Sequence, residues 1–172
     1  TLRRRGPVAL LGLSTGVPKP PFLATGTLGE AQIARAERLL AETGREGLCR
    51  VVLIHHPPLT TEKPFKSLTD AAAFQAMIRR VGCELVLHGH NHRSEVARID
   101  GPAGPVPVIG VTSASAASGS KYGRARYHLI HIEREAAGWR LGVEVRALRA
   151  EGIGCEPDGQ LVFRIAVPGV VG

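Results

Sequence analysis

The sequence predicts an α/β (α+β) domain, and two patterns along the chain lead to this prediction. Between residues 7 and 88, three short apolar runs alternate with two segments of helical periodicity, which is typical of parallel strands joined by helices. Downstream of residue 94, apolar and polar residues alternate between turn formers, which is typical of antiparallel strands. We expect a single domain over residues 1–172, with its core at about 7–148 and an edge extension at 149–172.

The first strand is expected at Pro7–Leu13, an apolar run between turn formers that suits burial on both faces. A proline-rich loop follows this strand. Thr27 and Glu30 then match a capping box, with Thr27 as the N-cap of a helix that ends near Gly44 or Gly47.

The second strand is expected at Arg50–His55, a β-branched and apolar run that stops where two prolines remove the donors of a hydrogen-bonded ladder. Thr69 or Asp70 then caps a second helix, which Gly82 closes. The apolar side of this helix is expected to carry Ala73, Met77 and Val81.

A third strand at residues 84–88 completes a β-α-β unit, whose two strands are expected to be parallel. The antiparallel strands are expected at 94–100, 105–112, 124–134 and 139–149, and a last strand at 160–167 is expected to add to an edge.

Composition narrows the class of protein. The 44% of apolar and 22% of charged residues are typical of a soluble globular domain, and no apolar run approaches the eighteen residues of a membrane span. The formal charge of +7 comes mostly from dispersed arginines and aromatic residues make up only 4%, which disfavours nucleic-acid binding. A modestly basic surface could equally attract a small phosphorylated substrate. Three cysteines without paired spacing favour a reducing, cytoplasmic compartment and inert, partly buried thiols: Cys49, Cys83 and Cys155.

Five histidines follow the ends of the two parallel strands. His55 and His56 lie at the end of the strand expected at 50–55. His88, His90 and His92 lie in the stretch LVLHGHNHR, at the end of the strand expected at 84–88. Parallel neighbours end at the same edge of a sheet, where open α/β sheets place their ligands, so these side chains are expected to converge. Clustered neutral imidazoles suit Zn, Mn or Fe.

The loop after the third strand is expected to be extended. An extended backbone would point His90 and His92 toward one metal centre or two adjacent ones, while Asn91 turns elsewhere. His88 is still in strand phase and is expected to face the opposite side. His128 and His131 have no companion at ligand spacing and are expected to be ordinary core or surface residues.

Two motifs together point to a known family. VVLIHHPPL, followed about thirty residues later by LVLHGHNH, resembles the C-terminal motifs of calcineurin-like metallophosphoesterases, especially the bacterial branch with cyclic-nucleotide phosphodiesterases. The resemblance covers roughly residues 7–148 and implies the C-terminal half of a four-layer α-β-β-α sandwich. It further implies a hydrolase of phosphoric ester bonds, a phosphodiesterase or phosphatase, that uses a hydroxide activated by two divalent metal ions (Mn, Fe or Zn).

The resemblance also implies roles for individual residues. His90 would bind one metal ion and His92 the other, and His55 would be a further ligand of the ion that His90 binds. The doublet leaves open which of His55 and His56 is the ligand. His56 and Asn91 are candidates for the substrate side or for contacts that orient the ligands. No catalytic residue is assigned to this chain.

The family's other ligands are absent from this chain. Its only aspartates, Asp70, Asp100 and Asp158, lie outside the family's motifs, and its only asparagine is Asn91. We therefore expect the C-terminal portion of a longer enzyme, whose missing N-terminal half supplies the other ligands. Alone, the chain is expected to bind at most one metal ion weakly, to be inactive, and to expose an edge of its first strand that the missing half covers.

Two other functions stay open. A non-catalytic mononuclear metal- or phosphate-binding module would use the same three histidines, and a basic nucleic-acid-binding domain would use none. Weaker signals are a Ser113–Ser120 loop that could line a substrate cleft and two lysines, Lys63 and Lys66, that could meet a phosphate, although loop and surface roles explain them more simply. The expected partner is a small phosphoester, with nucleotides among the candidates, and no membrane.

Overall fold

The computed structural model describes residues 1–59, 64–117 and 119–167. Its elements are β1 Leu2–Arg5, β2 Val8–Leu13, α1 Glu30–Arg45, β3 Cys49–Ile54, a 3₁₀ turn Pro64–Lys66, α2 Ala71–Val81, β4 Leu85–His88, β5 Glu95–Gly101, β6 Gly104–Gly110, β7 Arg126–Glu135, β8 Gly138–Leu148 and β9 Cys155–Ala166. A six-stranded sheet has the order β1-β2-β3-β4-β6-β5, and a three-stranded sheet has the order β7-β8-β9. The mixed α/β fold predicted from the sequence is confirmed.

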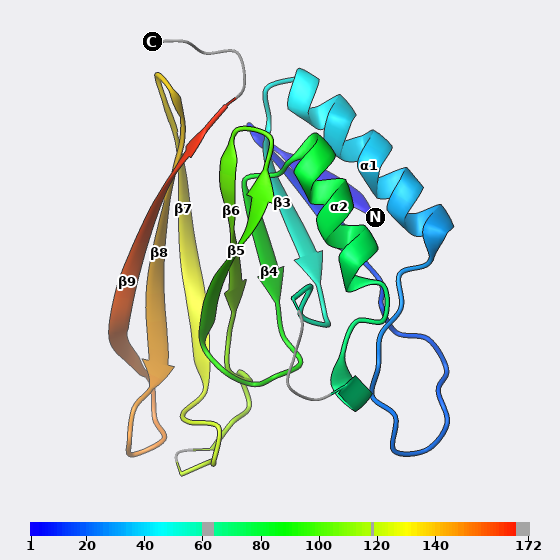
Figure 1. Ribbon diagram of the computed structural model, residues 1–172. Coiled ribbons are helices and arrows are strands. Elements are labelled where there is room, and N and C mark those ends of the chain that lie inside the picture. Colours follow the sequence, from blue (N-terminus) through cyan, green and yellow to red (C-terminus); the bar gives the residue numbers. More distant parts are fainter. Residues whose placement is uncertain (60–63, 118, 168–172) are drawn as a thin grey trace.

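Three layers stack in the order helices, larger sheet, smaller sheet (Figure 1). One core lies between the helices and the larger sheet, where Leu40 and Phe74 are buried together with Val52 and Val86. A second core fills the space between the two sheets and contains Val51, Leu85, Ile109, Leu141 and Phe163. Strands β3 and β4 therefore have apolar cover on both faces, which explains why their sequences are continuous apolar runs.

The predicted β-α-β unit is present and its strands are parallel. Strand β3 pairs with β4 in a register that sets Ile54 opposite His88, and β2 pairs with β3 in the same direction. The carboxyl ends of β3 and β4 consequently lie at one edge of the larger sheet, where the histidines follow them.

The start of helix α1 differs from the prediction. Thr27 is not its N-cap, because the helix begins at Glu30 and Gly29 precedes it with φ 78°. The Asp70 carboxylate instead accepts hydrogen bonds from the backbone amides of Leu28 and Gly29, at 2.8–3.1 Å. A side chain from the start of the next helix thus satisfies these donors.

The buried face of helix α2 is also shifted from the predicted one. Phe74, Met77 and Ile78 are buried, whereas Ala73 is exposed and Val81 is only partly buried. Phe74 and Ile78 contribute more apolar area than Ala73, so the helix is turned to place them against the sheet. Gly82 ends the helix with φ 70°, as predicted.

The edge of strand β2 is covered within this chain, contrary to the prediction. Strand β1 pairs antiparallel with it, from Leu2 opposite Leu11 to Arg5 opposite Val8, and β1 is the outermost strand. The expectation of partly buried cysteines is wrong for Cys155, which is exposed on β9, while Cys49 and Cys83 are buried. No helix in the described ranges is long and apolar enough to span a membrane.

Candidate functional site

The loops that follow β3 and β4 are joined by a hydrogen bond just beyond the last paired residues. The Gly89 amide donates to the His55 carbonyl oxygen at 3.1 Å. A Cβ at Gly89 would stand 3.7 Å from the His55 ring, so the two loops are in close contact. This bond continues the β3–β4 ladder past the strand ends and brings His55 beside the residue after Gly89, which is His90.

Three imidazole rings gather at this edge of the sheet. The His90 Nδ1 atom lies 3.1 Å from the His55 Nε2 atom. The ring centroids of His55 and His56 are 5.0 Å apart, those of His55 and His90 also 5.0 Å, and those of His56 and His90 4.2 Å. The His90 Nε2 atom is buried and has no hydrogen-bond partner among the described residues. A buried nitrogen without a partner is costly unless something binds it.

The surroundings of His90 keep its ring neutral. Burial is the largest cause that lowers the pKa of His90 to about 4, and the neighbouring charges of His56, His55, Lys66 and His92 act in the same direction. His90 is therefore unprotonated at neutral pH, and a nitrogen lone pair is available for a metal ion or a proton donor.

His56 is buried, and both of its ring nitrogens have hydrogen-bond partners. It is 6% exposed, its Nδ1 atom lies 2.6 Å from the Thr15 hydroxyl, and its Nε2 atom lies 3.1 Å from the Ala24 carbonyl oxygen. Burial lowers the pKa of His56, so the neutral ring donates from Nε2 to the carbonyl and accepts from Thr15 at Nδ1. Both nitrogens are engaged, which leaves His55 as the member of the doublet with a ring nitrogen next to a nitrogen of His90, at 3.1 Å.

Gly26 lets the loop approach this ring. A Cβ at position 26 would stand 2.3 Å from His56 Nδ1, closer than any side chain can tolerate. The neighbouring backbone is fixed by the Gly26 amide, which donates to the Ser67 carbonyl, and by the Ala24 amide, which donates to the Phe65 carbonyl. The histidines are therefore supported by Thr15, Gly26 and the segment around Phe65. These positions are far apart in the sequence, and no spacing pattern links them.

The loop after β4 is not extended, contrary to the prediction. His90 and His92 both have positive φ angles, 66° and 54°, and the Asn91 amide donates to the Gly89 carbonyl at 2.8 Å. Such backbone angles are uncommon outside glycine and are found at functional sites where the surroundings enforce them. The turn follows directly after Gly89, whose amide is bonded to the His55 carbonyl oxygen.

His92 lies on another side of the loop. Its ring packs edge-on against Tyr122 with centroids 5.6 Å apart, and the Lys121 ammonium lies 5.0 Å from the Tyr122 ring centroid. His92 is exposed, and the three-ring contacts of His55, His56 and His90 do not include it. Its role as the ligand of a second metal ion stays a prediction.

Asn91 and His88 point to Glu95. The Asn91 amide donates to both carboxylate oxygens of Glu95 at 3.2 and 3.3 Å, and His88 Nε2 lies 3.9 Å from the same carboxylate. His88 is buried, which lowers its pKa, and its Nδ1 atom lies 3.2 Å from the Gly89 carbonyl. Asn91 is thus tied to the start of β5, and the expected separation of His88 from the other histidines agrees with these contacts.

Two imidazole nitrogens at this edge lie close enough together to share one ligand. Two nitrogens bound to one tetrahedral zinc ion lie about 3.3 Å apart. The 3.1 Å between His55 Nε2 and His90 Nδ1 therefore suits a shared ion as well as a hydrogen bond. Among the described residues, however, no group of three or more His, Cys, Asp or Glu side chains is arranged to hold a metal ion. A dinuclear centre needs more ligands than these two nitrogens, so the described residues do not by themselves form one.

The remaining candidates from the sequence lie elsewhere. His131 Nε2 is 3.3 Å from a Glu144 carboxylate oxygen, and His128 is half-buried on the same strand, so both are ordinary residues of β7. The Ser113–Ser120 loop is described except at residue 118 and leads to Tyr122 beside His92. Lys63 lies outside the described residues.

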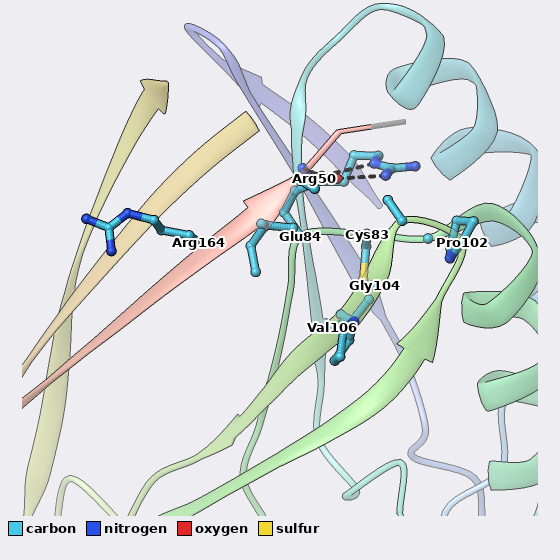
Figure 2. Close-up of a pocket in the computed structure, with 12 residues that line it drawn as sticks. Arg50, Cys83, Glu84, Pro102, Gly104, Val106 and Arg164 are labelled. Carbon is cyan, nitrogen blue, oxygen red and sulfur yellow. Dashed lines mark hydrogen bonds and ion pairs between the residues drawn. The ribbon is translucent and has the colours of Figure 1, made fainter. Parts of the chain in front are cut away.

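A cavity of about 130 Å³ lies at the opposite rim of the larger sheet (Figure 2). A buried ion pair lines it, in which Arg50 donates from Nη2 and Nε to the two Glu84 oxygens at 2.7 and 3.0 Å. Arg50 also donates to the Leu40 and Val81 carbonyls, so its donors are engaged within the protein. The charged groups in this cavity stabilise the fold and leave the histidine edge as the candidate site.

Comparison with known proteins identifies a solved structure with a similar fold. No protein family model matches the sequence, and no curated protein matches it. Among solved structures, a dimetal phosphatase from Danio rerio aligns with a TM-score of 0.54 at 13% identity, over 77% of this chain and 38% of its own. The chain therefore spans less than half the length of that phosphatase, and at this identity the likeness shows a shared metallophosphoesterase-type fold alone.

Two further solved structures align over more of the chain. GAP50 of Plasmodium, the anchor in the inner membrane complex, has a TM-score of 0.49 at 15% identity, over 91% of this chain and 52% of that one. A single mutant of Vps29 from Entamoeba histolytica has a TM-score of 0.37 at 12% identity, over 90% and 99% of the two chains. Both TM-scores lie below 0.5, where a shared fold does not follow.

Proposed function

We propose that this chain is the C-terminal part of a metal-dependent phosphoester hydrolase and that its histidine edge contributes ligands to the metal site. The observation that carries the proposal is the convergence of His55 and His90 at the ends of two parallel strands, where His55 Nε2 lies 3.1 Å from His90 Nδ1. The shared fold with a dimetal phosphatase supports the same chemistry.

Each residue at this edge has a distinct part in the proposal. His55 and His90 hold one divalent ion, and His92 turns toward a second site that is completed by upstream sequence. His56 holds the 15–26 loop against the ligands through Thr15 and Ala24. A bound divalent ion supplies positive charge that polarises a phosphoryl oxygen and lowers the pKa of water.

Zinc titration tests the metal site. Wild-type protein is expected to bind one zinc ion, and His90→Ala is expected to weaken binding by more than about 100-fold, because losing a ligand costs more than losing a group that orients one. His131→Ala is the matched control, since it removes an exposed imidazole that contacts only Glu144. Equal zinc affinity in wild-type and His90→Ala protein, measured by calorimetry, would disprove the metal site.

The hydrolase itself is tested by hydrolysis of p-nitrophenyl phosphate. The 172-residue chain is expected to be inactive with zinc or manganese, and the same chain extended by the encoded upstream sequence is expected to be active. Activity of the extended protein that survives His90→Ala would contradict the proposed role of this edge.

A non-catalytic mononuclear metal-binding module is the second candidate. The observation that favours it is the short distance between His55 Nε2 and His90 Nδ1, which needs no residue outside the described ranges. It predicts the same zinc binding and no hydrolysis by the extended protein, so the two measurements together separate the candidates.

A further inference from the structure

Exposed apolar side chains concentrate on the loops at the histidine end of the sheets. Among the described residues, ten large apolar side chains are exposed, and five of them lie on loops or turns at this end: Val17, Phe22, Leu23, Phe65 and Ile153. None of the ten lies on a described turn at the opposite end of the strands. In Figure 1, the loops 14–29, 111–125 and 149–154 extend furthest beyond the histidine end. These three loops, together with residues 64–69 and 89–94, are called the loop rim.

Phe22 is the most exposed of these side chains. It is 99% exposed and has a φ angle of 69°. The Leu23 amide donates to the Pro20 carbonyl at 3.3 Å, which closes a turn with Pro21 and Phe22 at its two central positions. Proline followed by a residue of positive φ is typical of a type II turn, where glycine is favoured at the second position. A bulky residue with positive φ costs free energy, and an almost fully exposed ring gains no packing within the chain that offsets this cost.

The projecting loops also carry positive charge. Residues 14–29, 89–94 and 111–125 contain four basic residues and no acidic one: Lys19, Arg93, Lys121 and Arg124. Arg124 pairs with Glu156 and Asp158, whereas the other three belong to no ion pair between described residues.

The acidic residues near the loop rim do not cancel this charge. Three of them stand behind the loops, at the starts of the adjoining elements: Glu30, Asp70 and Glu95. Asp70 accepts hydrogen bonds from backbone amides and Glu95 accepts from Asn91. The remaining segments of this end, 60–66 and 149–154, contain three basic and two acidic residues by sequence: Lys63, Lys66 and Arg149, and Glu62 and Glu151. Positive charge therefore lies on the projecting loops, and the negative charge at the element starts lies behind them.

Apolar loop tips flanked by basic residues fit the surface of an anionic membrane. Aromatic and aliphatic side chains insert at the boundary between headgroups and acyl chains, and lysine and arginine are attracted to anionic headgroups. Phe22 and Ile153 stand on separate loops, so a rigid protein partner would need a separate pocket for each of them. A fluid lipid surface receives both without such pockets.

We propose that the loop rim binds the surface of an anionic membrane, with Phe22 and Leu23 as the inserted side chains and with Lys19, Arg93 and Lys121 against the headgroups. This inference goes beyond the proposed function and needs no metal ion. The expectation of no membrane partner followed from the absence of a long apolar run, which peripheral binding does not require. Binding in this orientation holds the histidine end of the chain toward the lipid.

The test is sedimentation of the 172-residue chain with sucrose-loaded vesicles of phosphatidylcholine, with and without phosphatidylserine. Wild-type protein is expected to bind the vesicles that contain phosphatidylserine, and more weakly as the salt concentration rises. Phe22→Gly is expected to weaken binding by about tenfold, because it removes the inserted ring. Glycine suits the positive φ angle, so this variant preserves the turn. Val162→Ala is the matched control, since Val162 is an exposed apolar residue of β9 outside the loop rim.

Charge and insertion have separate readouts. Lys19→Gln is expected to weaken binding about fivefold at low salt, because each basic residue near an anionic surface contributes about that factor. Arg164→Gln removes an exposed cation beside the cavity at the opposite rim and is expected to bind as wild type. Phe22→Trp is expected to retain binding and to shift its fluorescence to the blue with phosphatidylserine vesicles, while the buried Trp139 does not respond.

Two results would overturn the inference: wild-type protein that does not sediment with phosphatidylserine vesicles, or Phe22→Gly that binds them as tightly as wild type. Self-association in light scattering that is lost in Phe22→Gly, without vesicle binding, would also overturn it and assign the loop rim to a second copy of the chain. His90→Ala is expected to bind vesicles as wild type does. A failure of the proposed metal site therefore leaves this inference intact, and a failure of vesicle binding leaves the metal site intact.

Discussion

Gly26 is the loop residue that lies directly against the ring of His56. A Cβ at this position would stand 2.3 Å from His56 Nδ1, so Gly26→Ala is expected to displace the ring and break its bonds to Thr15 and Ala24. Overpacking of this kind costs roughly 1–3 kcal/mol, which urea unfolding would measure. Gly16→Ala is the control in the same loop, since nothing lies within 4 Å of its Cβ position. Equal losses in the two variants would show that the His56 contact is unimportant.

His128 gives the protein a pH-dependent stability away from the candidate site. Burial lowers the pKa of His128 below its usual value of 6.5, and the Arg126 charge acts in the same direction. The unfolded chain therefore binds a proton at higher pH than the folded one, and the free energy of unfolding decreases as the pH falls below about 6.5.

His128→Gln is expected to flatten this dependence. Because glutamine does not titrate, wild-type protein should lose more stability than the variant between pH 7 and pH 5 in urea unfolding. Above pH 7 the difference between the two proteins should be constant. Parallel curves over the whole range would contradict a lowered pKa for His128.

At the scale of elements, the buried ion pair of Arg50 and Glu84 ties the start of β3 to the start of β4. The Glu84 carboxylate accepts from the Arg50 backbone amide as well as from its guanidinium, and both side chains are almost fully buried. Glu84→Gln leaves the buried arginine charge without its counterion, which costs roughly 3–5 kcal/mol of unfolding free energy. Glu37→Gln, which breaks an exposed pair with Arg80, is expected to change stability little. Guanidinium unfolding of both variants checks the contrast.

The strands of the larger sheet could be predicted because their apolar runs are strong and short. Arg50–His55 and residues 84–88 were placed within one residue of β3 and β4, and their parallel pairing followed from the helix between them. The start of α1 could not be predicted, because Asp70 satisfies its first amides from far along the chain. The capping-box pattern depends only on neighbouring residues, so it predicts Thr27 as the N-cap without regard to the contacts of Asp70.

The candidate site was only partly predictable for the same physical reason. The convergence of His55 and His90 follows from strand direction, which the sequence encodes locally. The engagement of both His56 nitrogens depends on Thr15 and Ala24, and the turned loop that separates His92 depends on the bond between Gly89 and His55. Such contacts between distant segments leave no periodic pattern in the sequence, so they could not be predicted from it.

At the scale of the whole molecule, metal binding is expected to stabilise the fold. An ion that binds only the folded chain raises the free energy of unfolding by about 2.7 kcal/mol at a free concentration of one hundred times its dissociation constant. Zinc should therefore raise the melting temperature of the wild-type chain, and a chelator should reverse the rise. His90→Ala should show no rise, and His131→Ala should respond as wild type. A rise that persists in His90→Ala would place the ion elsewhere.

The hydrogen bond from Gly89 to His55 connects the loops that carry the imidazoles to the buried β3–β4 ladder. The two innermost imidazoles stand one bond beyond the β3–β4 ladder, so their spacing is inherited from the register of a buried sheet. The 64–68 segment lies outside that register and is joined to this edge through the backbone of Ala24 and Gly26. Changes in that segment are therefore expected to leave the spacing of His55 and His90 as it is, whereas changes in the pairing of β3 with β4 would alter it.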